Sequence, residues 1–221
     1  MCLELFRSSI GKKQIVAFTG LLLILFVIGH LAGNLLIFGG PDVFNGYTVL
    51  LSKARPVVFI IELGLLAVFV THVFVTTCLV LENIKAVGGA RYAVSNTRGQ
   101  RSWATQLRVY TGLFLLIFVV WHLFDFTWSD HEGQRSILAH MHLGLYGVVY
   151  NSFLNPIHSV LYIIAMACLG FHLAHGVQSF LQTFGFNDPQ YTPVVYKFSN
   201  IFGFVIAVAF SSIPIYVLIR G

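Results

Sequence analysis

The sequence predicts an all-α integral membrane protein, a bundle of five transmembrane helices forming one domain over residues 1–221. Of these residues 57% are hydrophobic and only 10% are charged, which is too little charge to cover the surface of a water-soluble domain. Five apolar stretches are long enough to cross a bilayer, which takes about 20 helical residues. Histidines lie deep inside the first four stretches.

The predicted spans are residues 14–38, 57–81, 108–128, 157–183 and 198–219. Helices are expected because the strands of a membrane barrel would alternate polar and apolar residues. Gly39-Gly40-Pro41-Asp42 ends the first span, and Asn187-Asp188-Pro189 ends the fourth. Pro56 and Pro156 begin the second and fourth spans, where proline is tolerated, and Pro214 is expected to kink the fifth.

The distribution of basic residues predicts the orientation in the membrane, because cytoplasmic loops are enriched in Lys and Arg. Nine of the 13 basic residues fall on the side of the N-terminus: Arg7, Lys12, Lys13, Lys85, Arg91, Arg98, Arg101, Arg108 and Lys197. The opposite side holds Lys53, Arg55, Arg135 and Arg220. We therefore expect a protein of the inner (cytoplasmic) membrane with a cytoplasmic N-terminus. The net charge of +5 is explained by this orientation, and no nucleic-acid partner is expected.

The three cysteines, Cys2, Cys78 and Cys168, do not occur in CxxC or CxxCH motifs. This spacing excludes zinc ribbons, thioredoxin-like redox motifs and covalent c-type haem attachment. No cleavable signal peptide is expected, because the first apolar segment is too long for a signal core.

Four of the nine histidines, His30, His72, His122 and His172, lie one to a helix inside the first four spans. Ionisable residues at such depth are costly and usually functional. An interhelical hydrogen bond explains one such histidine but does not readily explain four. The remaining histidines are expected in solvated or interfacial positions (His131, His140, His142 and His158), apart from His175, which lies one turn beyond His172.

The direction of the helices sorts the four histidines into two pairs. His30 and His122 come late in helices that run outward, whereas His72 and His172 come late in helices that run inward. Each level, outer and inner, therefore holds one histidine from each of two helices, and the levels should lie about 15 Å apart. Two neutral imidazoles fill both axial positions of a haem iron, and this favours electron transfer. We expect two haem b groups, stacked across the membrane and enclosed by four helices.

His172 is preferred to His175 as the inner ligand because of its depth. His72 lies sixteen residues after Pro56, and His172 lies sixteen residues after Pro156, whereas His175 lies nineteen residues along. Equal rise from equal starting points puts His72 and His172 at one level.

An internal repeat relates residues 19–30 to residues 111–122, with seven of twelve positions identical. Thr19 and Thr111 each precede a histidine by eleven residues, about three helical turns, so each lies on the face of its histidine at the inner level. We expect them to line the inner haem. Gly20 and Gly112 then give the porphyrin room, or allow close helix packing.

Haem propionates need cationic or hydrogen-bonding partners near the membrane interfaces. Lys12 and Arg108 are candidates at the inner edge, and Asn34, one turn past His30, is a candidate at the outer level. Anchoring of the helices at the interface explains the same two charges.

With these features, the chain resembles the di-haem cytochrome b membrane-anchor subunit of succinate:quinone oxidoreductases and fumarate reductases. It shares five spans, histidines in the first four and none in the fifth. The segment Phe171-His172-Leu173-Ala174-His175-Gly176, followed by Gln178 and Phe184-Gly185, resembles the family's fourth helix, where the ligand stands four residues before a glycine. The resemblance implies the same ligands: His30 and His122 for the outer haem, and His72 and His172 for the inner haem.

The resemblance also implies partners. A flavoprotein subunit would carry FAD and oxidise succinate, and an iron–sulfur subunit would pass electrons to the inner haem from the cytoplasmic side. Neither chemistry is encoded here, because the sequence has no dinucleotide-binding glycine motif and no cysteine cluster. Some fumarate reductases of the family carry a proton-transferring glutamate two residues before the fourth-helix ligand, where this chain has Gly170.

Quinone is the expected membrane substrate, and its reduction needs a proton donor near a haem. Glu62 is a candidate near the outer surface, and His175 with Gln178 is a candidate at the inner level. Two other functions stay open. One is a cytochrome b that serves a hydrogenase or formate dehydrogenase, and the other is a transporter with a histidine proton relay.

Overall fold

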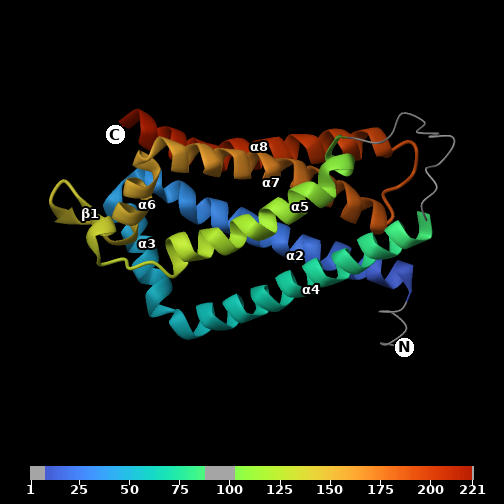
Figure 1. Ribbon diagram of the computed structural model, residues 1–221, viewed down its shortest axis with the longest axis horizontal. Helices are drawn as coiled ribbons and strands as arrows, with labels where there is room; N and C mark the ends of the chain where they lie inside the picture. Colours follow the sequence, from blue (N-terminus) through green and yellow to red (C-terminus); the bar gives the residue numbers. More distant parts are fainter. Residues whose placement is uncertain (1–7, 88–102, 221) are drawn as a thin grey trace.

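The computed structural model describes residues 8–87 and 103–220. Its five long helices run along the long axis of the molecule (Figure 1): α2 (Ser9–Leu35), α4 (Arg55–Val87), α5 (Trp103–His122), α7 (Pro156–Thr183) and α8 (Thr192–Arg220). The five stretches able to cross a membrane are Ser9–Gly39, Arg55–Ala86, Gln106–Thr127, Pro156–Thr183 and Thr192–Arg220. The prediction of an all-α protein with five helices long and apolar enough to cross a membrane is confirmed.

The shorter elements connect the long helices at the end opposite to the start of α2 (Figure 1). They are η1 (Leu36–Gly39), α3 (Pro41–Lys53), the π-helical turn η2 (Leu123–Thr127), η3 (Gln134–Ser136), β1 (Ile137–Leu138), β2 (Met141–His142) and α6 (Gly144–Leu154). Strands β1 and β2 form one antiparallel hairpin. We call this end the hairpin end, and the end where α2 begins the N-terminal end.

Proline and glycine punctuate the chain as the sequence analysis expected. Gly40 has a φ of 87°, which favours glycine, and it separates η1 from α3, whose first residue is Pro41. Gly185, with a φ of 104°, follows the end of α7. Pro214 lies inside α8, which continues past it to Arg220.

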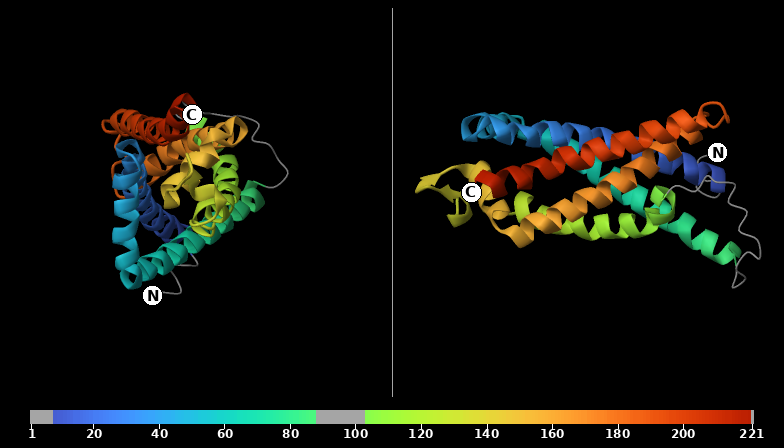
Figure 2. Two further views of the ribbon diagram at one scale, coloured as in Figure 1. Left: turned by 90° about the vertical axis from the view of Figure 1, so that its left-hand side faces the viewer. Right: turned by 90° about the horizontal axis from the view of Figure 1, so that it is seen from above.

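The long helices pack in two pairs, α2 with α4 and α5 with α7, and α8 lies along α7. The views in Figure 2 show α8 beside α7, and they show α4 on the side of α2 that is away from α8. Helix α4 turns a row of apolar side chains outward, with Ile60, Leu66, Val70 and Phe74 more than half exposed. Such a surface suits lipid rather than water.

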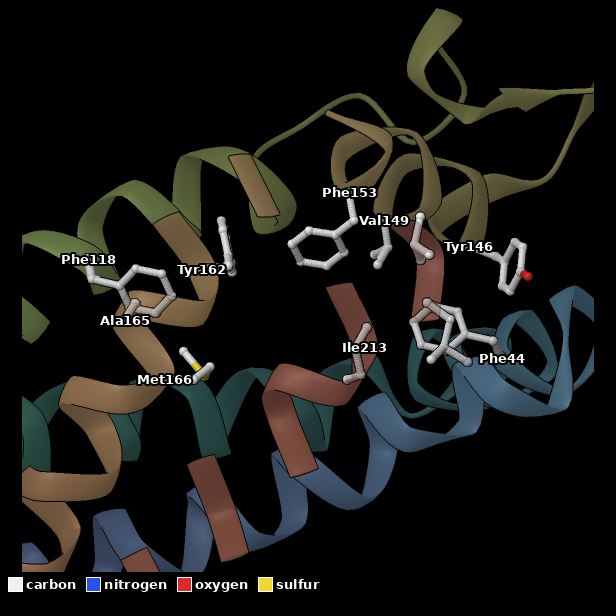
Figure 3. Close-up of a cluster of buried hydrophobic side chains, with 11 residues drawn as sticks. Phe44, Phe118, Tyr146, Val149, Phe153, Tyr162, Ala165, Met166 and Ile213 are labelled. Carbon is white, nitrogen blue, oxygen red and sulfur yellow. The ribbon is translucent and has the colours of Figure 1, made fainter. Parts of the chain in front are cut away.

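The buried side chains form two clusters. The larger one lies toward the hairpin end and joins α3, α5, α6, α7 and α8 (Figure 3); it includes Phe44, Phe118, Phe153, Tyr162 and Ile213. The smaller one, between α2, α7 and α8, comprises Ile24, Leu31, Leu173, Val177 and Ile206. Because both clusters include α7, this helix is the centre of the packed core.

The repeat seen in the sequence extends to the fold. Helices α2, α3 and α4 occur in the same order as α5, α6 and α7: a long helix, a short helix, and a second long helix with a proline at its start. The two short helices are in contact through Asn45. Its side-chain amide donates to the carbonyl of Leu143 at 2.8 Å and accepts from the backbone N–H of Tyr146 at 3.2 Å. The chain therefore contains two similar three-helix units followed by α8.

Helices α3 and α6, of 13 and 11 residues, lie in segments that the sequence predicts as connections between spans. Five residues named in the sequence analysis lie outside the described residues: Cys2, Arg7, Arg91, Arg98 and Arg101.

Candidate functional site

His30 of α2 and His122 of α5 lie close together toward the hairpin end of the bundle, in a T-shaped arrangement. Their ring centroids are 5.8 Å apart, and the ring planes are 89° apart. Phe26 stacks on His30, and Phe118 stacks on His122. Two imidazoles that share one metal, each bound at about 2.0 Å, would place their ring centres about 6 Å apart. The spacing of this hairpin pair therefore fits a single metal between the rings.

His72 of α4 and His172 of α7 are the other two interior histidines, and we call them the N-terminal pair. Each ring lies beside a threonine and the glycine that follows it on the neighbouring helix, and we call these two consecutive residues a Thr-Gly step. The steps are Thr19-Gly20 on α2 and Thr111-Gly112 on α5. Thr19 Oγ1 lies 3.0 Å from His72 Nδ1, and Thr111 Oγ1 lies 3.4 Å from His172 Nδ1. The two Thr–His contacts of this pair are thus alike, and each lies within one three-helix unit.

The glycines that follow these threonines leave room for the histidine rings. A Cβ added to Gly20 would lie 3.4 Å from Cε1 of His72, and one added to Gly112 would lie 3.2 Å from Cε1 of His172. The sequence analysis had assigned this space to a porphyrin or to helix packing. In the structure, the imidazole ring from the neighbouring helix lies in this space.

The two pairs lie at two levels of the bundle. His72 sits beside Thr19, and His30 follows Thr19 by eleven residues on the same helix. At a rise of 1.5 Å per residue, this is a separation of about 16 Å. Thr111 and His122 give the same spacing along α5. The two levels are therefore far enough apart to hold two separate groups.

Two histidines at each level supply the number of protein ligands that a haem iron needs. In residues 8–87 and 103–220, no three His, Cys, Asp or Glu side chains gather in a way that could hold a bare metal ion. Haem iron needs only two protein ligands, because the porphyrin supplies the other four. The hydroxyl of Thr76, one turn after His72 on α4, is buried without a partner among the described residues. A polar edge of a bound group would satisfy it.

The candidate propionate partners each have a neighbour in the structure. Lys12 forms an ion pair with Glu82 of α4. The side chain of Asn34 donates to the carbonyl of His30 at 2.8 Å. The backbone of Arg108 bonds to His172, and its charge acts on His175.

The proposed quinone-site residues differ in their surroundings. Glu62 pairs with Arg55 at 2.7 Å, and the two side chains are 46% and 59% exposed. Gln178, in contrast, is buried in α7, and half-buried His175 lies one turn before it. Gly170 has no room for a side chain, since a Cβ there would lie 2.9 Å from both Ala207 Cβ and the carbonyl oxygen of Gly203. Close packing against α8 occupies the place of the family's glutamate.

A polar network beside His122 was missed by the sequence analysis. Tyr162 donates to Asp125 Oδ2 at 2.9 Å and lies 3.4 Å from His122 Nδ1. Arg135 donates to Asp125 Oδ1 at 2.8 Å, and His158 Nε2 lies 3.0 Å from Oδ2. The side chain of Asp125 is only 9% exposed. The available signal was an aspartate inside a predicted span, three residues after a candidate ligand.

The backbone explains how Asp125 reaches this position. It belongs to the π-helical turn η2, which directly follows His122. Such turns rotate the side chains that follow relative to an α-helix and are frequent at functional sites. His158, assigned to the interface from sequence, stacks on Tyr162 and belongs to this network.

Comparison with known proteins gives no match, whether to protein-family models, to curated proteins or to solved structures. The function is therefore argued from the residues and their geometry.

Proposed function

We propose that this chain is the di-haem cytochrome b subunit that anchors a succinate:quinone oxidoreductase in the membrane. The observation that carries the proposal is the arrangement of four interior histidines, from four membrane-spanning helices, as two pairs at two levels. A proton relay does not require such pairing, whereas two haems with two axial ligands each do.

In this proposal His30 and His122 hold one haem b, and His72 and His172 hold the other. Haem iron with two imidazole ligands transfers single electrons and has no open position for oxygen. The chain orients the imidazole rings and keeps water away from them. Phe26 and Phe118 pack on the rings of the hairpin pair, and the Thr-Gly steps pack on those of the N-terminal pair.

The partners follow from the same proposal. Succinate oxidation would take place on a flavoprotein subunit with FAD, and an iron–sulfur subunit would deliver electrons at the N-terminal end. The sequence places nine of the 13 Lys and Arg residues on the side of that end, which supports a cytoplasmic location. Membrane quinone would accept the electrons within this subunit.

For the proton route to quinone, the Asp125 network is a further candidate beside Glu62, because it joins a proposed haem ligand to the exposed side chain of Arg135. Asp125 is nearly buried beside a proposed haem ligand, and Arg135, 44% exposed, links it toward the surface. Glu62 is held in an exposed ion pair on the outward face of α4. His175 with Gln178 is the remaining candidate, at the N-terminal end.

The test of this function is a reduced-minus-oxidised optical spectrum of the purified complex, together with identification of the proteins that co-purify. We expect low-spin b-type haem bands and a flavin-bearing partner that oxidises succinate. A hydrogenase or formate dehydrogenase partner would support the other cytochrome b reading. A colourless chain would contradict the proposal and favour the transporter with a histidine relay.

A further inference from the structure

The hydroxyl of Thr19 is placed to offer a lone pair to His72. A threonine hydroxyl carries one proton, and that of Thr19 is donated to the carbonyl of Ile15, one turn earlier, at 2.7 Å. His72 Nδ1, 3.0 Å away, therefore faces an acceptor. The carbonyl of Val16 bonds to the same ring and is also an acceptor. The Thr19 hydroxyl thus favours a proton on Nδ1 of His72.

The second three-helix unit repeats this arrangement residue by residue. Thr111 donates to the carbonyl of Leu107 at 3.0 Å and lies 3.4 Å from His172 Nδ1, and the backbone carbonyl of Arg108 bonds to the His172 ring. Leu107, Arg108 and Thr111 correspond to Ile15, Val16 and Thr19, each 92 residues later in the chain. The same hydrogen-bond pattern therefore occurs twice, once for each histidine of the N-terminal pair.

A neutral imidazole carries one N–H, so a proton on Nδ1 leaves the Nε2 lone pair free to bind a metal. An acceptor at Nδ1–H also fixes the orientation of the ring and makes Nε2 a stronger donor. We propose that Thr19 and Thr111 are positioning residues that hold His72 and His172 as Nδ1-protonated ligands and thereby lower the reduction potential of the haem between them. This inference rests on the proposed function.

The hairpin pair is built differently. The partner of His122 is the phenol of Tyr162, which lies 3.4 Å from Nδ1 and donates its own proton to Asp125. The two threonines belong to the N-terminal level, about 16 Å away along α2 and α5. Removing their hydroxyls should therefore change one haem and leave the other as a control inside the same molecule.

The experiment compares the Thr19→Val, Thr111→Val double variant with the Thr19→Ser, Thr111→Ser variant in the intact purified complex. Redox titration with optical and electron paramagnetic resonance detection resolves the two haems. We expect the valine variant to raise the midpoint potential of the N-terminal haem and shift its low-spin signal, with the other haem unchanged. The serine variant should retain the wild-type potential because it keeps the hydroxyl. The single valine variants should give smaller shifts in the same direction, which tests the proposal even if the double variant does not assemble.

Thr77→Val is the matched control. Thr77 also donates to a carbonyl one turn earlier, that of Val73 at 2.8 Å, but it is exposed on α4. It should leave both potentials unchanged. Valine variants with two haems at wild-type potentials would overturn the role of the threonines while leaving the proposed function intact. A wild-type complex without haem would instead overturn the proposed function.

Discussion

At the scale of single residues, each interior histidine is supported by a specific neighbour. Thr19 and Thr111 contact the N-terminal pair, whereas Phe26 and Phe118 stack on the hairpin pair. Spacing in the sequence was enough to place each threonine at the level of the inner histidines, because helical rise is constant. It could not show that the hydroxyl contacts the imidazole of another helix, since this depends on how the helices pack.

The choice between the two histidines of α7 can be tested by substitution. His172→Ala should abolish the low-spin signal of one haem and leave the other, because His172 is the ring that meets Thr111 and Gly112. His175→Ala should keep both haems, since His175 lies near Arg108 rather than at the Thr-Gly step. Optical and electron paramagnetic resonance spectra of the two variants give the comparison. If His175→Ala abolished the signal and His172→Ala did not, the ligand would be His175, one turn further along α7.

The Asp125 network gives a second prediction at this scale. Asp125→Asn should retain both haems but slow succinate:quinone turnover about tenfold, because Asp125 joins Arg135, His158 and Tyr162 in one network beside His122. Glu62→Gln is the matched control: it removes an exposed carboxylate of α4 and should have a smaller effect. Steady-state kinetics with haem content measured in parallel would decide. A larger loss from Glu62→Gln would place the proton donor at Glu62.

At the scale of elements, helix α7 is held against α8 by two glycines. A Cβ added to Gly203 would lie 2.3 Å from the carbonyl oxygen of Gly170, and backbone at this distance cannot yield as a flexible side chain can. Gly203→Ala should therefore separate the helices and destabilise the fold by about 1–3 kcal/mol, the usual range for overpacking. Thermal unfolding of the solubilised protein measures this.

Gly64→Ala on α4 is the control for that substitution. A Cβ at Gly64 meets nothing within 4 Å, and alanine is the better helix former. We expect unchanged or slightly higher stability. Equal losses from the two substitutions would show that the contact between Gly170 and Gly203 does not hold α7 to α8.

The sequence predicted the long helices well because a membrane span has a strong signal, about 20 apolar residues in a row. It missed α3 and α6, whose 13 and 11 residues are too short to be spans. It also missed the π-helical turn at Leu123–Thr127, because a single turn of this kind depends on local backbone hydrogen bonds that leave no periodic pattern. Asp125 was overlooked for this reason, since its partners Arg135 and His158 come from distant segments.

At the scale of the whole molecule, two similar three-helix units place one Thr–His contact each at the same level. Parallel repeats of this kind are common in membrane proteins and put functional groups near the interface between the repeats. Here that interface lies between the pairs α2–α4 and α5–α7. Each level therefore receives one histidine from each unit.

The orientation of the bundle is a prediction of its own. In a background without native cysteines, a cysteine at Ser95, in the connection between α4 and α5, should react with an impermeant reagent only after the membrane is opened. A cysteine at exposed Glu132, at the hairpin end, should react in intact cells. The reason is the excess of Lys and Arg at the N-terminal end. The reverse labelling would invert the orientation and move the proposed partners to the other side.

The central claim is that four histidines hold two haem b groups in one chain. The most direct measurement is the pyridine haemochrome content of the purified protein per mole of chain, after extraction with acid acetone. We expect about two non-covalently bound haems per chain, since four axial ligands at two per iron hold two irons. A content of one haem per chain, haem that resists extraction, or no haem at all would contradict the account.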